Sequence, residues 1–373
     1  MLIGIPSEIK QQEHRVGLVP SSVKEFTTNG HQVMVQAGAG LGINFSDQDF
    51  KDVGAEIVTT AEEVFERAEM IIKVKEPLPA EFKLIRKDQI IFTYLHLAAD
   101  PAQAKALIDS GCVAIAYETV TGRNNQGLPL LAPMSEIAGR LSVQVGAYYL
   151  QKHKGGTGRL ISGVPGVKPA EVLILGGGVA GFNAAQMATG LGANVTILER
   201  NNDRMRYLDD YFRGRANVVY SNIDIVERFI QTADLVVGTV LIPGESAPRI
   251  ITKDMLKTMQ KGAVLVDVSI DQGGCFETSH VTTHNEPTYV VDGITHYCVG
   301  NMPGAVPLTS ALALNHSVLP YALSIANKGW KEALLSDSGL RQGLNICQGE
   351  VTHSGVATSL NLPFIASPQA LSA

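Results

Sequence analysis

The chain has 373 residues, which is enough for two domains of ordinary size. Hydrophobic residues make up 45% of it and charged residues 18%, a composition typical of globular proteins. The formal net charge is −6 and like charges form no block, which argues against the basic surface of a nucleic-acid-binding protein. The 4 cysteines lie far apart in the sequence, so neither a disulfide framework nor a zinc site is indicated.

We expect no nucleic-acid partner and no membrane partner for this chain. Residues 1–10 lack the basic lead and long apolar run of a secretory signal and predict a first β-strand instead. The longest apolar region, around 172–198, is interrupted by glycines and amide side chains, which is not typical of a membrane span. The expected location is the cytoplasm.

The first third of the chain alternates short β-rich runs with helical patterns. Such alternation is typical of parallel sheets built from βαβ units. The expected strands span residues 2–5, 32–35, 70–73, 90–94 and 113–116. Helices such as 21–28 and 101–110 are expected between them, and the polar stretch 121–127 predicts an exposed loop.

A second alternating series follows a helix expected over 135–152, with Ser135 as its N-cap, and a glycine-rich stretch at 155–169. Its expected strands span residues 172–175, 194–198, 217–220, 235–240, 263–270 and 288–291. From Val306 onward the pattern is mainly helical, with too few strands for a third domain. We therefore expect this tail to pack back on the first domain.

The strongest local motif joins the apolar strand 172–175 to Gly176-Gly-Gly-Val-Ala-Gly181 and the start of a helix. In such a motif the first glycine permits a tight turn, Gly178 lets the backbone approach a pyrophosphate, and Gly181 allows close helix–strand packing. Glu199 ends the next strand 18 residues after the last glycine, near the ~20 expected for a carboxylate that binds ribose hydroxyls. A glycine-rich turn of an unrelated fold would not explain that acid, so the motif predicts a dinucleotide site.

Three polar residues of the first half lie at or beyond expected strand ends, where sites in open α/β sheets form. Lys75 follows the strand at 70–73, His96 follows that at 90–94, and Arg15 lies in the loop after the first strand. A 2-oxo or 2-amino acid needs a cation for its carboxylate and a proton donor–acceptor, which these side chains can supply. Taken singly, Lys75 also fits a solvated surface lysine and His96 a structural histidine.

Two further candidates lie in the second series. Asp271 follows the strand at 263–270 and begins Asp-Gln-Gly-Gly, a tight loop whose backbone amides can face a ligand. Asn301 begins Asn-Met-Pro-Gly, which a simple turn would explain equally well.

At these residues the chain resembles the alanine dehydrogenase family, from the N-terminus to about residue 330. The motifs that carry the resemblance are Glu13-x-Arg15-Val with Pro20, Lys73-Val-Lys75-Glu-Pro77, His96-Leu-Ala-Ala99, Ala132-Pro-Met-Ser-Glu136, Gly163-Val-Pro-Gly166, Asp271-Gln-Gly-Gly-Cys-Phe-Glu277 and Asn301-Met-Pro303.

The resemblance implies reversible oxidative deamination of L-alanine with NAD to pyruvate, ammonium and NADH. It also implies an α/β fold of two Rossmann-like, doubly wound parallel-sheet domains separated by a cleft, assembled as a homohexamer. On this basis we expect residues 1–129 plus 307–373 to form a discontinuous substrate domain and residues 130–306 to form the NAD-binding domain.

Residue roles follow from the same resemblance. Arg15 and Lys75 would bind the substrate, His96 would be the acid–base, and Asp271 would be the second catalytic residue. The residues implied in cofactor binding are Ser135, Gly176, Gly178, Val179, Ala180, Gly181, Glu199, Arg204, Ser221, Thr239, Val240, Val268, Asp271, Val299, Asn301 and Met302.

The chain departs from the family pattern at three places. Glu199 stands where members often have Asp, and His280 stands where a member can carry a cofactor-binding arginine. Glu118 is one half of a divalent-metal site of some members, but Lys328 aligns with the histidine that completes it. Because a second cation opposes a cation site, no metal is expected.

Two other classes of protein share part of this pattern. The NAD-binding subunit of a proton-translocating transhydrogenase has a similar N-terminal motif but needs a membrane partner. A non-enzymatic dinucleotide sensor needs only the glycine loop and Glu199, and would leave the set of Arg15, Lys75, His96 and Asp271 unexplained.

Overall fold

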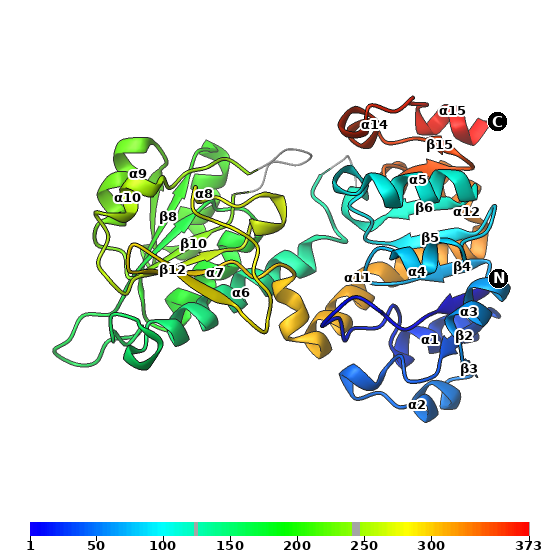
Figure 1. Ribbon diagram of the computed structural model, residues 1–373, viewed down its shortest axis with the longest axis horizontal. Helices are drawn as coiled ribbons and strands as arrows, with labels where there is room; N and C mark the ends of the chain where they lie inside the picture. Colours follow the sequence, from blue (N-terminus) through cyan, green and yellow to red (C-terminus); the bar gives the residue numbers. More distant parts are fainter. Residues whose placement is uncertain (123–125, 241–246, 373) are drawn as a thin grey trace. The chain divides into compact units, whose positions relative to one another are not determined.

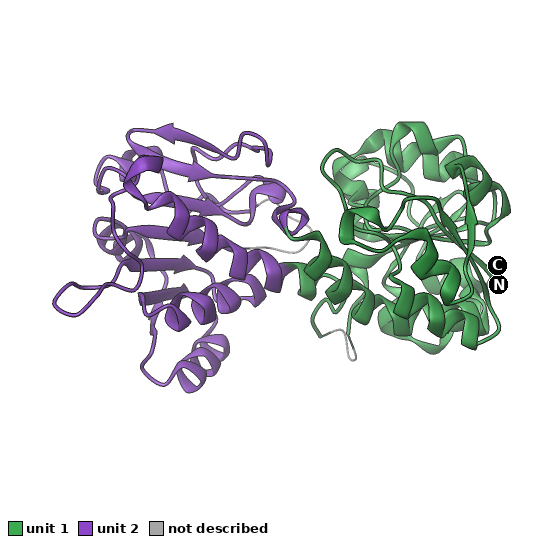
Figure 2. Cartoon of the chain, turned by 90° about the horizontal axis from the view of Figure 1, so that it is seen from below, with its two compact units in different colours: residues 1–134, 306–373 green, residues 135–305 purple. Residues whose placement is uncertain are grey.

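The structure is a computed structural model that describes residues 1–122, 126–240 and 247–372. The chain divides into two compact units, one of residues 1–134 with 306–373 and the other of residues 135–305 (Figure 2). Each unit is described by itself. The loop expected at 121–127 lies partly outside the described residues, because 123–125 are among those left out.

Unit 1 contains an eight-stranded sheet in the order β15-β14-β6-β5-β4-β1-β2-β3 (Figure 1). Its strands are β1 (Leu2–Ile5), β2 (Gln32–Gln36), β3 (Glu56–Val58), β4 (Met70–Ile72), β5 (Ile90–Thr93), β6 (Val113–Ala116), β14 (Leu344–Cys347) and β15 (Glu350–Val351). The six strands β1 to β6 run parallel, whereas β14 pairs antiparallel with both β6 and β15.

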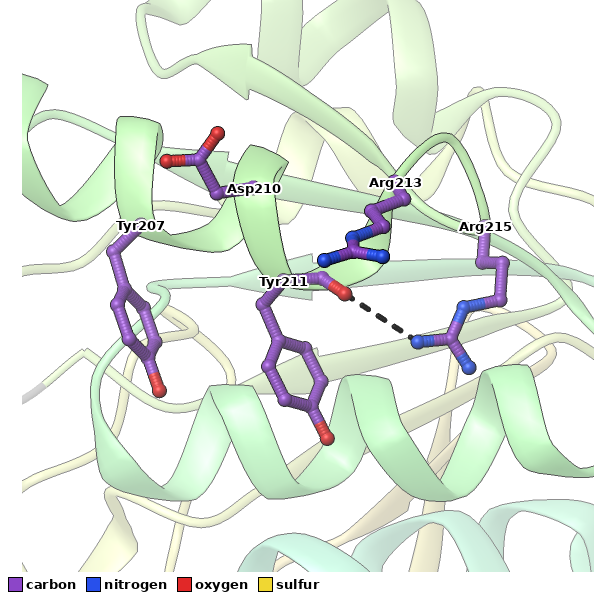
Figure 3. Close-up of a pocket in the computed structure, with 5 residues that line it drawn as sticks. All are labelled: Tyr207, Asp210, Tyr211, Arg213 and Arg215. Atoms are coloured by element: carbon purple, nitrogen blue, oxygen red, sulfur yellow. Dashed lines mark hydrogen bonds between the residues drawn. The ribbon is translucent and has the colours of Figure 1, made fainter.

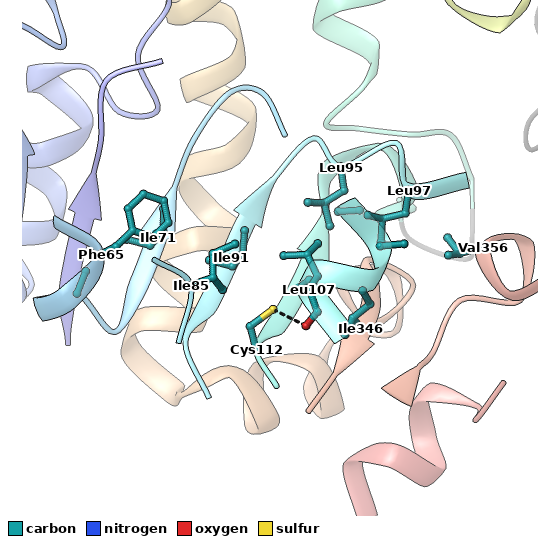
Figure 4. Close-up of a cluster of buried hydrophobic side chains, with 14 of the residues drawn as sticks. Phe65, Ile71, Ile85, Ile91, Leu95, Leu97, Leu107, Cys112, Ile346 and Val356 are labelled. Atoms are coloured by element: carbon teal, nitrogen blue, oxygen red, sulfur yellow. Dashed lines mark hydrogen bonds between the residues drawn. The ribbon is translucent and has the colours of Figure 1, made fainter. Parts of the chain in front are cut away.

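Helices flank this sheet, and β4, β5 and β6 are consequently buried along their whole length. The helices are α1 (Pro20–Thr28), α2 (Asp47–Asp52), α3 (Ala61–Arg67), α4 (Pro79–Phe82), α5 (Pro101–Ser110), α11 (Pro307–Lys328), α12 (Trp330–Ser336), α13 (Ser338–Arg341), α14 (Ser354–Leu360) and α15 (Ser367–Ser372). One buried hydrophobic cluster joins Phe65, Ile91 and Leu107 to Ile346 and Val356 of the C-terminal segment (Figure 4).

Unit 2 contains a seven-stranded sheet in the order β12-β13-β11-β10-β7-β8-β9. Its strands are β7 (Glu171–Leu175), β8 (Asn194–Glu199), β9 (Asn217–Tyr220), β10 (Leu235–Gly238), β11 (Val264–Asp267), β12 (Thr288–Val291) and β13 (Ile294–Tyr297). Its helices are α6 (Ala132–Tyr149), which begins in unit 1, α7 (Val179–Gly190), α8 (Asn202–Phe212), α9 (Ile223–Ile230) and α10 (Lys253–Leu256). Only the edge strand β12 runs antiparallel within the described part of this sheet.

Two features of the sequence analysis are corrected by the fold. Ser135 is not a helix cap: α6 begins at Ala132, and Ser135 lies inside its first turns. Pro133 does not prevent this start, because the first turn of a helix needs no backbone N–H at that position. The strands β3, β13, β14 and β15 were not expected, since each has only two to four residues and little alternation.

Candidate active site

The glycine loop connects β7 to α7 in unit 2. Gly176 has φ +93°, a left-handed conformation that favours glycine. A Cβ at Gly181 would lie only 1.8 Å from the Gly176 carbonyl oxygen, so no side chain fits there. At Gly178, by contrast, a Cβ would meet no described atom within 4 Å, which leaves the N-terminus of α7 open. This arrangement suits a pyrophosphate that approaches the backbone at a helix N-terminus.

Glu199 ends β8 beside this loop, and backbone amides hold its carboxylate. Oε2 accepts a hydrogen bond of 2.8 Å from the Gly177 amide, and Oε1 accepts bonds of 2.7 and 2.9 Å from the amides of Arg200 and Asn201. A carboxylate offers about four acceptor positions. The carboxylate is therefore fixed next to the phosphate loop with capacity left for a hydroxyl donor.

Arg204 of α8 contacts the loop backbone in this structure. Its Nε donates to the Gly177 carbonyl at 2.5 Å and its Nη2 to the Gly178 carbonyl at 3.4 Å. Its guanidinium lies over the rings of Tyr207 and Phe182, 4.7 and 5.4 Å from their centroids. These contacts hold the loop against α8.

A pocket of about 430 Å³ lies near the C-terminal end of α8 and contains none of the predicted site residues (Figure 3). It is lined by Tyr207, Asp210, Tyr211, Arg213 and Arg215. The Arg215 guanidinium donates to the Tyr211 and Phe212 carbonyls at the end of the helix, which explains its place there.

Most of the other residues expected at the cofactor follow strands of the same sheet. The Thr239 hydroxyl, after β10, donates to the Leu175 and Gly176 carbonyls at 2.8 and 2.9 Å. The Ser221 amide, after β9, donates to the backbone carbonyl of Glu199. The rest of this group are Val240 after β10, Val268 after β11, and Val299, Asn301 and Met302 after β13. Because parallel strands end at the same edge, these residues lie at the edge of the sheet that also carries the glycine loop.

Ser135 and the helix-start residues Val179 and Ala180 complete the expected set. A Cβ at Gly139 would lie 2.1 Å from the Ala180 carbonyl oxygen, so α6 crosses the start of α7 in close contact. Ser135 lies one helical turn before Gly139 on the same face of α6. Ser135 is therefore on the face of α6 that contacts the start of α7.

Asp271 lies in a short 3₁₀ turn, Ile270–Gln272, just after β11. Its Oδ2 accepts a hydrogen bond of 3.4 Å from the amide of Asn301, whose φ is +60°. The contact joins the loops after β11 and β13.

A residue that the sequence analysis missed, Asp267, anchors the loop that carries Asp271. Its buried carboxylate accepts bonds from the Ser269 amide at 3.1 Å, the Cys275 amide at 2.8 Å and the Ser279 hydroxyl at 2.5 Å. Burial raises the pKa of Asp267 despite these donors. The available signal was an acid at the end of the otherwise apolar run Val264-Leu-Val.

In unit 1, Arg15 is buried and bound by a carboxylate on its own loop. Its Nη2 lies 2.5 Å from Glu13 Oε2, and its Nε donates to Glu13 Oε1 at 2.6 Å. Its Nη1 lies 3.1 Å from the Met134 sulfur. Although burial alone would lower the pKa of Arg15, Glu13 raises it, so the cation is retained.

Lys75 and His96 follow neighbouring parallel strands, β4 and β5. The Thr93 hydroxyl donates to the Lys75 carbonyl at 3.0 Å, and the Tyr94 amide donates to the Val74 carbonyl at 3.4 Å. Lys75 Nζ lies 3.8 Å from Glu76 Oε2, beyond hydrogen-bond distance. These links hold the backbones of the two candidates side by side.

The imidazole of His96 is accessible, with 47% of the side chain exposed. The residue has φ +52°, and its ring stacks on that of Tyr94 with centroids 5.9 Å apart. Its amide donates to Glu118 Oε1 at 2.6 Å, while its Nδ1 lies 4.0 Å from the same oxygen. The bond to Glu118 thus holds the His96 backbone in a left-handed conformation, and the ring is exposed to solvent.

The three departures from the family pattern have defined surroundings. Glu118 accepts the amides of Leu95 and His96, and Lys328 Nζ donates to the Ser336 hydroxyl at 3.1 Å. His280 stacks on Tyr289 with ring centroids 3.7 Å apart. Within residues 1–122, 126–240 and 247–372, no group of three or more His, Cys, Asp or Glu side chains is arranged to hold a metal ion.

The fold and the glycine loop together define an α/β protein of two units, one of which has the features of a dinucleotide-binding domain. Two family models match the chain: alanine dehydrogenase/PNT, N-terminal domain, over residues 4–138, and alanine dehydrogenase/PNT, C-terminal domain, over residues 142–354. The chain belongs to the alanine dehydrogenase family of oxidoreductases, whose members use a dinucleotide cofactor.

Known proteins resemble the chain over its whole length. It is 52% identical to an alanine dehydrogenase of Methanococcus maripaludis over 372 residues, 100% of each chain. A solved L-alanine dehydrogenase superposes with a TM-score of 0.93 at 51% identity, covering 97% of this chain and 99% of that one. A transhydrogenase of Sinorhizobium meliloti, 24% identical, covers 95% of this chain and 99% of its own with a TM-score of 0.81, and shares the fold. In the described residues no helix is both long and apolar enough to cross a membrane.

Proposed function

We propose that the protein is an L-alanine dehydrogenase that uses NAD. It would convert L-alanine, NAD⁺ and water to pyruvate, ammonium, NADH and a proton, and would also run the reverse amination. The observation that carries this proposal is that Lys75 and the accessible imidazole of His96 follow the ends of neighbouring parallel strands. The full-length similarity to alanine dehydrogenases supports the choice of substrate.

NAD is the proposed cofactor because Glu199 lies beside the glycine loop. A carboxylate accepts hydrogen bonds from ribose hydroxyls and repels a 2′-phosphate. The open space at Gly178 suits the pyrophosphate, and Gly176, Val179, Ala180 and Gly181 would surround it. The remaining residues proposed for cofactor contact are Ser135, Arg204, Ser221, Thr239, Val240, Val268, Asp271, Val299, Asn301 and Met302.

Arg15 and Lys75 would bind the substrate carboxylate, Lys75 as a fixed cation and Arg15 through the planar guanidinium. The guanidinium already contacts Glu13 and the Met134 sulfur in this structure, and the substrate carboxylate would bind beside these partners. The bound nicotinamide supplies the chemistry of hydride acceptance from the α-carbon.

His96 would exchange protons with the substrate nitrogen and with the water that hydrolyses the imine. Both transfers need a group that changes protonation near neutral pH, which an imidazole does and an ordinary lysine amine does not. Asp271 would be the second catalytic residue, orienting the amine or the attacking water through its carboxylate.

We further propose that the protein assembles as a homohexamer in the cytoplasm. The support is the membership of the family rather than any contact within the chain. A light-scattering mass of six chains is expected for the active enzyme, and a mass of one chain would contradict it.

The test of the function is a spectrophotometric screen of NAD reduction by the purified protein across amino acids. L-alanine should give the highest kcat/KM. Comparable turnover of other amino acids would contradict the substrate assignment. Dinucleotide binding without turnover of any amino acid would favour the alternatives, a transhydrogenase-like subunit or a non-enzymatic dinucleotide sensor.

A further inference from the structure

The buried carboxylate of Glu8 contacts the backbone at the end of β4, where Lys75 lies. It follows β1, the neighbour of β4, and only 2% of its side chain is exposed. Its Oε1 accepts hydrogen bonds from the Val74 amide at 2.6 Å and the Lys75 amide at 3.4 Å. Its Oε2 lies 3.2 Å from Lys73 Nζ. Glu8 therefore contacts the backbone of Lys75 and the ammonium of Lys73.

Lys73 is fully buried and lies between two carboxylates. Besides Glu8 it contacts Glu81, whose Oε1 accepts a hydrogen bond of 2.9 Å and whose Oε2 accepts the Leu78 amide at the start of α4. Although burial alone would lower the pKa of Lys73, the two carboxylates raise it. Lys73 is thus the positively charged partner of both Glu8 and Glu81 inside unit 1.

The ammonium of Lys75 belongs to a different part of the structure. It lies nearest Glu76, at 3.8 Å, and the other oxygen of Glu76 accepts a hydrogen bond from Lys10. Although burial alone would raise the pKa of Glu76, Lys75 and Lys10 together lower it. Two lysines two residues apart therefore have separate side-chain partners, and Glu8 is hydrogen-bonded to the backbone of the second one.

We propose that Glu8 is a positioning residue for Lys75. Its charge-assisted bonds to the 74–75 amides fix the end of β4, so that the Lys75 ammonium is held where the substrate carboxylate binds. The 2.6 Å bond to the Val74 amide is the short one; a charge-assisted bond is roughly twice as strong as one between neutral groups, and burial keeps water from replacing it. This inference rests on the proposed function, because it deepens the role assigned to Lys75.

Glu81 provides a matched control. Glu8 and Glu81 are almost equally buried and both contact Lys73, so replacing either removes one buried negative charge from the same cation. The two differ in their backbone partners, which are Val74 and Lys75 for Glu8 but Leu78 for Glu81. A general effect of losing buried charge would be common to both replacements, whereas an effect on Lys75 would follow from Glu8 alone.

The experiment compares Glu8→Gln with Glu81→Gln in NADH-dependent amination of pyruvate. Glu8→Gln should raise the KM for pyruvate ~10-fold or more while kcat falls ~3-fold at most, because a misplaced binding group weakens substrate binding first. Glu81→Gln should leave that KM within ~2-fold, and NADH binding should be unchanged in both variants. An unchanged KM in Glu8→Gln, or equal rises in the two variants, would overturn the proposal.

Two further variants keep the test decisive. Glu8→Asp retains the charge beside Lys73 but shortens the reach to the amides, so it should fold and still raise the KM for pyruvate; a wild-type KM would overturn the proposal. In a Lys75→Gln background, Glu8→Gln should change the KM by less than ~2-fold, since both act through one group. Independent, additive effects would overturn the proposal. Absence of amination by the unmodified protein would instead refute the proposed function itself.

Discussion

At the scale of single residues, His96 combines an accessible ring with a backbone that is tightly held. The left-handed φ of +52° is uncommon for a residue with a side chain, and the Glu118 carboxylate stabilises it by accepting the His96 amide. The conformation is consistent with a proton-transfer role for the ring.

Replacement of His96 tests that role. His96→Ala should lower kcat for alanine oxidation by about 10²–10⁴, because a positioned acid–base contributes a factor of this size. NADH binding, measured by fluorescence titration, should stay near that of the unmodified protein. His153→Ala, which removes an exposed histidine from a turn of unit 2, is the matched control. Near-normal turnover of His96→Ala would assign the proton transfers to another group.

Glu199 shows how far sequence alone predicts a site. Its position follows from the spacing after Gly181, but the three amides that hold its carboxylate come from the folded loop and the next turn. With three donors in place, about one acceptor position remains for a ribose hydroxyl. Binding of both hydroxyls would require one of them to share an oxygen with an amide.

Cofactor choice follows from the same carboxylate. We expect kcat/KM with NAD to exceed that with NADP by at least ~100-fold, on the order of 3 kcal/mol, because a 2′-phosphate would meet a fixed negative charge. Glu199→Gln should reduce the ratio of kcat/KM with NAD to kcat/KM with NADP, since a neutral amide would not repel the 2′-phosphate. Equal rates of the unmodified protein with NAD and NADP would show that Arg200 or Arg204 governs the choice instead.

At the scale of elements, most strands with a distinct apolar run were predictable, including the antiparallel β12, whereas the short strands β3, β13, β14 and β15 were not. Strands such as β1, β6 and β9 have the expected bounds, because a short apolar run between turn residues leaves few alternatives. The short β14 is recognisable only through its pairing with β6, a contact between distant parts of the chain. The residues after β11 mislead for a related reason: Ile270 is buried, so the apolar run continues after the strand has ended.

The contact between α7 and β7 gives a prediction at this scale. Gly181→Ala should abolish measurable NADH binding and lower the melting temperature, because its Cβ would overlap the Gly176 carbonyl oxygen at 1.8 Å. Gly190→Ala is the control in the same helix, where a Cβ would meet no described atom within 4 Å. That variant should bind NADH normally and be as stable or slightly more stable. Equal NADH affinity in both variants would contradict the packing role of Gly181.

At the scale of the whole molecule, stability should depend on pH through one buried and one half-buried histidine, His296 and His353. His296 is buried, with Nδ1 3.1 Å from the Ile294 carbonyl and Nε2 2.8 Å from the Thr278 hydroxyl. Burial lowers the pKa of His296, and it also lowers the pKa of His353. Below the ordinary pKa of about 6.5 the unfolded chain therefore binds more protons than the folded one, so acid favours unfolding.

The melting temperature should accordingly fall as the pH is lowered from about 7 to about 5.5. His296→Gln should be less stable at neutral pH, since it disturbs a packed site, but its melting temperature should change less over this interval. The exposed His153→Gln variant should retain the full dependence. An unaltered pH dependence in His296→Gln would show that other groups cause it.

Each unit places its candidate residues at the carboxyl ends of parallel strands, those for the cofactor in unit 2 and those for the substrate in unit 1. The central claim is that this pair of sites serves amination and not simple reduction of a 2-oxo acid. The most direct test is oxidation of NADH by the intact protein with pyruvate, in the presence and absence of ammonium. We predict rapid oxidation only when both are present. Equal oxidation with pyruvate alone, or none with both, would contradict the account.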